Sequence, residues 1–113
     1  MPGEAIGRCS AVQAGGLAYI VATDPFCADG IAAQTANTLE ELDRLLREVG
    51  SDKTQLLQAT VYLSDIAFKP EMDVEWNDWI GPEANWPQRA CVGVALDPGY
   101  LIEVVVTARS VEE

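Results

Sequence analysis

The segment Trp86-Pro87-Gln88-Arg89-Ala90-Cys91-Val92-Gly93-Val94-Ala95-Leu96 sets the first expectations for the fold. Pro87 marks a loop, and the residues after it alternate as in a β-strand, whose successive side chains point to opposite faces. One face is expected to pack in the core and carries Ala90, Val92, Val94 and Leu96. The other face begins with an arginine and continues with small residues, namely Arg89, Cys91, Gly93 and Ala95.

An arginine beside small residues has open space above it, and this suggests a ligand. The planar guanidinium of Arg89 could hold a carboxylate through two parallel hydrogen bonds. A surface arginine at the end of a strand explains the same pattern. The local sequence leaves both interpretations open.

Hydrophobic periodicity predicts the other elements. A helix is expected from about Ile31 to Val49, because its apolar residues recur at steps of three and four, and Gly50 is a typical residue just past a helix end. A shorter helix is expected at 71–80. Strands are expected at 8–13, 17–22, 58–64 and 101–109 in addition to the Arg89 strand.

The resulting order, ββαβαββ, predicts one two-layer α+β domain over residues 1–113, with both helices on one face of a single sheet. The other face is expected to hold Thr60, Tyr62, Arg89, Cys91, Glu103 and Val105. That face is too apolar to be fully solvated, so a symmetric oligomer is expected to cover it. Asp97-Pro98-Gly99 predicts a hairpin turn that would make Arg89 and Glu103 neighbours across the ladder.

Composition excludes several classes of function. The net charge is −11, from 18 acidic and 7 basic residues. Nucleic-acid binding depends on neutralising phosphates with Lys and Arg, so neither a nucleic acid nor an anionic membrane is an expected partner. No apolar run reaches the roughly 20 residues of a membrane span, and Met1–Glu4 does not look like the start of a signal peptide. A cytoplasmic location is therefore expected.

Cysteine and histidine usage narrows the chemistry further. The three cysteines, Cys9, Cys27 and Cys91, are widely spaced and form no CxxC motif, so neither a disulfide framework nor a zinc site is expected. The chain has no histidine. This removes the usual general base and the Ser-His and Cys-His pairs. Carboxylates, arginine, hydroxyls, thiols, backbone groups and water must supply any chemistry.

Short motifs follow one another in a fixed order along almost the whole chain. They are Ala5-Ile6-Gly7, Gly15-Gly16-Leu17, Gln34-Thr35-Ala36-Asn37-Thr38-Leu39, Val49-Gly50-Ser51, Ala59-Thr60-Val61-Tyr62-Leu63-Ser64-Asp65, Pro87-Gln88-Arg89-Ala90-Cys91-Val92 and Leu101-Ile102-Glu103-Val104. In this order and spacing the chain resembles the reactive-intermediate deaminase family, also called the YjgF or Rid family, and particularly its YoaB-like branch.

The resemblance implies a chorismate-mutase-like fold and a homotrimer. In such a trimer the sheets form an inner barrel, and a ligand cleft lies at each subunit interface. It also implies an enzyme that hydrolyses 2-imino and enamine acids, giving a 2-keto acid and ammonia without a cofactor. A small carboxylate-bearing metabolite is then the expected partner.

The same resemblance assigns roles to individual residues. Arg89 matches the arginine that binds the substrate carboxylate. Glu103 matches the glutamate that orients the attacking water, after a deletion of one residue in the preceding turn. Cys91 matches the residue whose backbone faces the ligand.

The chain departs from the family pattern at the wall of the cleft. Cys9 stands where the active deaminases carry a tyrosine, and the glutamine expected after Ser10 is missing. Ala22-Thr23 replaces a Ser-Gly pair, so Cys9 and Thr23 are expected to shape the substrate site.

These departures leave two functions open. The first is imine and enamine deamination. The alternative is a trimer that binds small carboxylate metabolites without catalysis and acts as a sensor. Ribonuclease activity fits poorly with the charge of −11 and the lack of histidine, and chorismate mutase chemistry would need more cationic groups than Arg89 provides.

Overall fold

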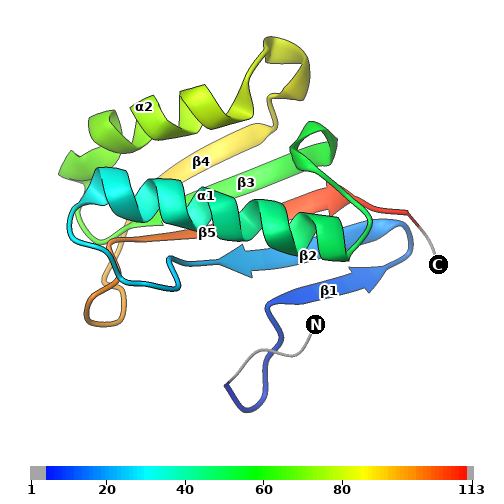
Figure 1. The fold of residues 1–113 in the computed structure, drawn as a ribbon, viewed down its shortest axis with the longest axis horizontal. Helices are drawn as coiled ribbons and strands as arrows, with labels where there is room; N and C mark the ends of the chain where they lie inside the picture. The colour runs from blue at the N-terminus through cyan, green and yellow to red at the C-terminus, as the bar shows by residue number, and fades with distance from the viewer. Residues whose placement is uncertain (1–4, 112–113) are drawn as a thin grey trace.

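A five-stranded sheet carries both long helices on one of its faces, as Figure 1 shows. The computed structural model describes residues 5–111, so the segments 1–4 and 112–113 of the predicted domain lie outside it. The elements are β1 (Ala11–Ala14), β2 (Leu17–Ala22), α1 (Ile31–Glu48), β3 (Leu56–Leu63), α2 (Lys69–Ile80), β4 (Gln88–Gly93) and β5 (Ile102–Arg109). The predicted ββαβαββ order and the α+β class are confirmed.

Helix α1 forms where the apolar stripe predicted it. Gly30 precedes the helix with φ of 86°, a conformation that glycine adopts without steric cost. The helix ends at Glu48, and Gly50 follows with φ of 69°. The Gly50 N–H donates to the carbonyl of Arg47 at 3.1 Å, and the Ser51 N–H donates to that of Leu46 at 2.9 Å. These bonds satisfy carbonyl groups that the helix end leaves without partners.

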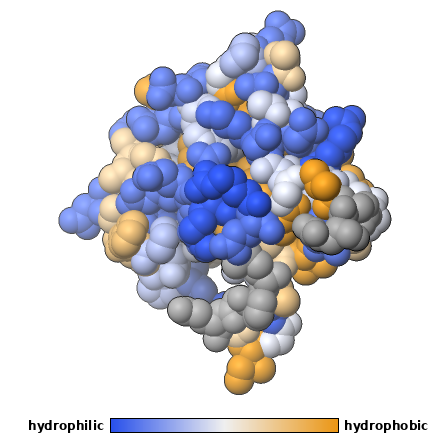
Figure 2. Space-filling view, turned by 45° about the vertical axis from the view of Figure 1, so that its right-hand side comes forward, coloured by the Kyte–Doolittle hydropathy of each residue, from blue (hydrophilic) through white to orange (hydrophobic). Residues whose placement is uncertain are grey.

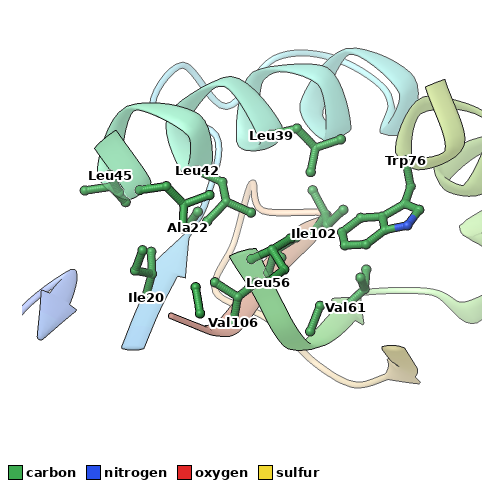
Figure 3. Packing of buried hydrophobic residues seen from close by; sticks show 14 of the residues in the cluster. Ile20, Ala22, Leu39, Leu42, Leu45, Leu56, Val61, Trp76, Ile102 and Val106 are labelled. Atoms are coloured by element: carbon green, nitrogen blue, oxygen red, sulfur yellow. The ribbon is translucent and has the colours of Figure 1, made fainter. Parts of the chain in front are cut away.

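The core lies between α1, α2 and the sheet. Figure 3 shows leucines of α1 pointing down onto side chains of β2 and β5, while Trp76 of α2 points toward Val61 of β3. The labelled side chains are all buried: Ile20, Ala22, Leu39, Leu42, Leu45, Leu56, Val61, Trp76, Ile102 and Val106. Burying each large apolar side chain stabilises the fold by about 1.5–3 kcal/mol.

The strand order is β1-β2-β5-β3-β4, and this corrects the predicted hairpin. Strand β4 pairs with β3 in parallel, whereas β5 lies between β2 and β3 and is antiparallel to both. The turn at Asp97 exists, since the Tyr100 N–H donates to the Asp97 carbonyl at 3.1 Å. However, residues 94–101 lead the chain past β3, so β4 and β5 are not neighbours.

The register of β4 also reverses the predicted faces of that strand. Arg89 lies opposite Ala59, and Cys91 lies opposite Val61. Ala59 and Val61 are fully buried under the helices, so Arg89 and Cys91 lie on the helix-covered face. Val92 lies opposite Tyr62 on the other face, which we call the open face. Glu103 also lies opposite Tyr62, so Arg89 and Glu103 are on opposite faces of the sheet and are not cross-strand neighbours.

The open face is partly apolar. Several large apolar side chains on it are exposed by two fifths or more: Val12, Tyr19, Val21 and Val92. Figure 2 shows the other, helix-covered side of the molecule, turned so that the right-hand side of Figure 1 comes forward, and that surface is hydrophilic at its centre and hydrophobic toward its right-hand and lower margins. Apolar side chains on a sheet face without a covering layer are typical of a surface that binds another chain.

The side chain of Gln34 ties two loops to the start of α1. Its Nε2 donates to the carbonyl of Ala28 at 2.9 Å and to that of Gly99 at 2.8 Å. Its Oε1 accepts from the Leu101 N–H at 2.9 Å. Gln34 is almost fully buried. It thus joins the connection after β2 to the connection before β5.

We therefore expect Gln34→Ala to lower the free energy of unfolding by about 2 kcal/mol, because three part-buried hydrogen bonds to backbone groups are lost. Urea unfolding at equal protein concentration measures this. Gln55→Ala is the control, since the hydrogen bond of the Gln55 side chain within residues 5–111 is a 3.3 Å bond to its neighbour Thr54. Equal stability of the two variants would contradict the structural role of Gln34.

Candidate functional site

The guanidinium of Arg89 is held between helix α2 and the edge of the sheet. Its Nη2 donates to Asp73 Oδ1 at 2.7 Å, and its Nη1 lies 3.8 Å from Met72 Sδ. The guanidinium carbon lies 5.3 Å from the centre of the Trp76 ring, within the range of a cation–π interaction. About one fifth of the arginine side chain is exposed. Among the described residues its Nε–H has no partner, so the fork keeps donors for a ligand.

Asp73 forms ion pairs with two cationic side chains, Arg89 and Lys69. Besides Arg89, it accepts a hydrogen bond from Lys69 Nζ at 2.8 Å, one helical turn earlier. Burial raises the pKa of Asp73, but the hydrogen bonds and charges of Lys69 and Arg89 outweigh this effect and lower the pKa below 3.8. The three side chains therefore form a cluster with one surplus positive charge, which favours an anionic ligand.

Beside Arg89 lies a small pocket of about 190 Å³. Its lining residues come from the end of α2 and from the segment that leads into β4. They are Trp76, Asn77, Ile80, Trp86, Pro87 and Arg89.

Cys91 lies on the same face as Arg89 and packs against the core. Burial raises the pKa of the Cys91 thiol, and the positive charges of Arg89 and Lys69 offset only part of this effect. The thiol is therefore protonated at neutral pH and is a poor nucleophile. This agrees with a role for the backbone of Cys91 rather than for its sulfur.

Glu103 lies in a separate hollow. The hollow measures about 940 Å³, and Cys9, Thr23 and Glu103 all line it, together with Arg8 and Tyr100. Strand β2 ends with Ala22 opposite Val104, so Thr23 comes next to Glu103 one step further along. The three residues predicted from the altered cleft wall and from the water-orienting glutamate are thus brought together.

The loop after Thr23 has a fixed shape. The buried carboxylate of Asp24 accepts hydrogen bonds from the N–H groups of Phe26 at 2.7 Å and Ala28 at 2.9 Å, and from Asn37 Nδ2 at 3.2 Å. Burial raises the pKa of Asp24, but these hydrogen bonds outweigh it, and the pKa is lowered. A charged, fully bonded carboxylate therefore holds this wall of the hollow in place.

The predicted site residues fall into two groups on opposite faces of one sheet. Arg89 and Cys91 lie on the helix-covered face, whereas Cys9, Thr23 and Glu103 lie around the hollow. Asp73 and Trp76 were not predicted from the sequence as partners of Arg89. The spacing of four residues between Lys69 and Asp73 signals a helical ion pair, but nothing in the sequence placed that pair beside β4.

Two negative findings concern the described residues. Across 5–111, no group of three or more Cys, Asp and Glu side chains is arranged to hold a metal ion. In the same range, no helix has both the length and the apolar character needed to cross a membrane.

Comparison with known proteins decides the family. A family model described as endoribonuclease L-PSP matches residues 5–110. The chain belongs to this family. The L-PSP family is the YjgF/RutC/Rid family, so the resemblance found in the sequence motifs is confirmed.

Individual relatives support the same family assignment. Over 76 residues, or 66% of the chain, it is 40% identical to a RutC family protein of Haemophilus ducreyi and 36% identical to the RutC family protein YoaB of Escherichia coli. These matches span slightly under two thirds of the relatives, at 64% and 66% of their lengths. The crystal structure of NMB1025, a YjgF family member from Neisseria meningitidis, superposes with a TM-score of 0.86 at 34% identity, covering 96% of this chain and 92% of that chain.

The Asp73 cluster gives a prediction about pH. We expect Asp73→Asn to lower the free energy of unfolding by about 1 kcal/mol at neutral pH, because a partly buried carboxylate that serves two cations is lost. The folded-state pKa of Asp73 lies below 3.8, so its stabilising effect is complete above pH 3.8 and is lost as the pH falls through the folded-state pKa. The difference between the two proteins should therefore shrink as the pH falls below 3.8.

Thermal unfolding at a series of pH values measures this difference. Asp78→Asn serves as the control, because Asp78 is an exposed carboxylate on the same helix and has no partner among residues 5–111. A constant difference between wild type and Asp73→Asn across the acid range would refute the charge-based role of Asp73.

Proposed function

We propose that the protein hydrolyses 2-imino acids, and the enamines in equilibrium with them, to 2-keto acids and ammonia. The observation that carries the proposal is Arg89, a partly buried guanidinium with free donors beside a pocket, at the position where the L-PSP family pattern expects a carboxylate-binding arginine.

Arg89 would hold the substrate carboxylate through a bidentate pair of hydrogen bonds. Asp73 and Trp76 orient the guanidinium before the ligand arrives. A preorganised arginine loses less side-chain entropy on binding than a freely moving one. Cys91 would present its backbone to the ligand two residues further along β4.

Glu103 would act on the same substrate from a neighbouring subunit. Within one chain Glu103 and Arg89 are on opposite faces of the sheet, so a shared substrate requires two copies. The exposed apolar side chains of the open face offer the contact surface. A homotrimer with a cleft at each interface, one wall carrying Arg89 and the other carrying Glu103, Cys9 and Thr23, satisfies both requirements.

The reaction needs only these groups and water. Glu103 orients a water molecule toward the imine carbon and accepts one of its protons as the new C–O bond forms. That proton passes to the nitrogen of the resulting tetrahedral carbinolamine. The hydroxyl proton of the carbinolamine then passes through Glu103 to the nitrogen as the C=O bond forms and the C–N bond breaks, and the products are ammonia and the keto acid.

The second candidate is a trimer that binds keto acids without catalysis. Cys9 in place of the family tyrosine favours this alternative, because it changes the wall that holds Glu103. RNA cleavage, the activity in the description of the family model, is not part of the proposal, since the chain carries a net charge of −11 and no histidine.

Activity is tested by measuring keto-acid and ammonia release from imino acids generated in place by an amino-acid oxidase. We expect wild type to accelerate release. Arg89→Ala should lower kcat/KM roughly 100-fold or more, because a bidentate charged hydrogen bond is lost. Glu103→Gln should lower kcat roughly 100-fold with little change in KM, because the proton acceptor is lost but the carboxylate anchor is kept.

Arg47→Ala and Glu40→Gln are the matched controls, since both residues are exposed on α1 and line neither the pocket beside Arg89 nor the hollow that contains Glu103. Both should retain wild-type rates. Binding of keto acids by a wild type that shows no acceleration would replace the deaminase with the sensor.

The oligomer is tested independently. Light scattering should give about three times the 12.2 kDa mass of one chain. Val92→Glu should weaken the assembly, because it places a charge on the open face among apolar side chains. Val74→Glu is the control on the outer side of α2, where Val74 is also exposed. A monomeric wild type would overturn the shared-cleft arrangement.

A further inference from the structure

The apolar walls of the pocket beside Arg89 have no role in the chemical step proposed above. The volume of the pocket indicates that they could bind part of a ligand. Its volume is about 190 Å³. Apolar cavities of about 150 Å³ bind benzene, so this pocket has room for a phenyl ring or a branched alkyl group. Trp86 is 59% exposed, which places the pocket at the surface, where a ligand can enter.

The walls of the pocket are fixed before any ligand binds. The short 3₁₀ helix Glu83–Asn85 follows α2, and Asn85 Nδ2 donates to the Ile80 carbonyl at 2.9 Å. Trp86 Nε1 donates to the Gly81 carbonyl at 2.9 Å. The polar edge of the indole is thus bonded to the end of α2, and Pro87 limits the backbone that follows.

The pocket and the guanidinium form one continuous surface. Arg89 lies over the Trp76 ring, and both residues line the pocket together with Trp86. A carboxylate bound at Arg89 would therefore leave the rest of the ligand next to two indole rings. Apart from Arg89, the polar side chain in the lining is Asn77.

We propose that this pocket receives the apolar side chain of the substrate, so that the protein prefers 2-imino acids with aromatic or branched side chains to the small imine derived from alanine. The inference rests on the proposed function, because it takes Arg89 as the anchor of the substrate carboxylate. Trp86 is then a specificity-determining residue. Filling an apolar pocket with several additional carbon atoms commonly changes kcat/KM by tenfold or more.

The test compares the imines of phenylalanine and alanine, each generated by an amino-acid oxidase with catalase present. We expect wild type to favour the phenylalanine imine at least tenfold in kcat/KM. Trp86→Ala should lower this preference about tenfold, mainly through KM for the larger substrate. Trp86→Phe, which keeps an aromatic wall, should restore most of it.

Val74→Ala is the control, because Val74 is an exposed apolar residue of α2 outside the pocket. It should keep the wild-type preference. A wild type that favours the alanine imine would overturn the proposal. An equal loss with both substrates in Trp86→Ala, or a change in the oligomeric state of that variant, would do so too.

Binding separates this inference from the proposed reaction. Calorimetric titration with phenylpyruvate and with pyruvate needs no catalysis. Wild type could hydrolyse neither imine but bind phenylpyruvate at least tenfold more tightly than pyruvate, with that difference removed by Trp86→Ala. This result would support the pocket assignment and refute the deaminase activity. If hydrolysis occurs while wild type and variant bind both keto acids with equal affinity, the deaminase activity is supported and the pocket assignment is refuted.

Discussion

The parallel pairing of β4 with β3 is the constraint on which the arrangement of the site depends. It sets Arg89 opposite Ala59 and thus turns the guanidinium toward α2. There the guanidinium donates a hydrogen bond to Asp73, lies near the sulfur of Met72 and lies over the ring of Trp76. The same pairing leaves β5 in the middle of the sheet, where Glu103 faces away from the helices. One strand register therefore separates the two residues that the family pattern assigns to one substrate.

Much of the fold follows from the sequence, because local patterns and long-range packing agree. The apolar stripe of α1 is predicted by the spacing of its apolar residues, and the end of the helix is predicted by Gly50. The faces of β4 are not visible in this way. Its apolar residues Ala90 and Val92 lie on the open face, and the buried side receives Arg89, whose guanidinium lies against the Trp76 ring. At an edge strand the apolar phase of the alternation need not be the buried phase, because another chain can cover either face.

The candidate site was predictable only in part, for a related reason. The family pattern identifies Arg89 and Glu103 as residues, but pairing between strands cannot be deduced from a turn sequence such as Asp97-Pro98-Gly99, which here joins strands that β3 separates. The partners of Arg89 on α2 are distant in sequence and carry no local signal toward β4. Cys9 and Thr23 were easier to predict, because both are departures from the family pattern and both line the hollow, Thr23 just after β2 and Cys9 in the segment that Ser10 joins to Val21 of β2.

The hydrogen bonds of Gln34 have a consequence for motion. One amide bridges Ala28 on one connection with Gly99 and Leu101 on the other, and both connections border the hollow that contains Glu103. Opening either connection removes bonds that fix the Gln34 side chain, which also anchors the other connection, so the two should open as one cooperative unit rather than as independent loops. Their amide protons would then exchange with solvent at a common rate.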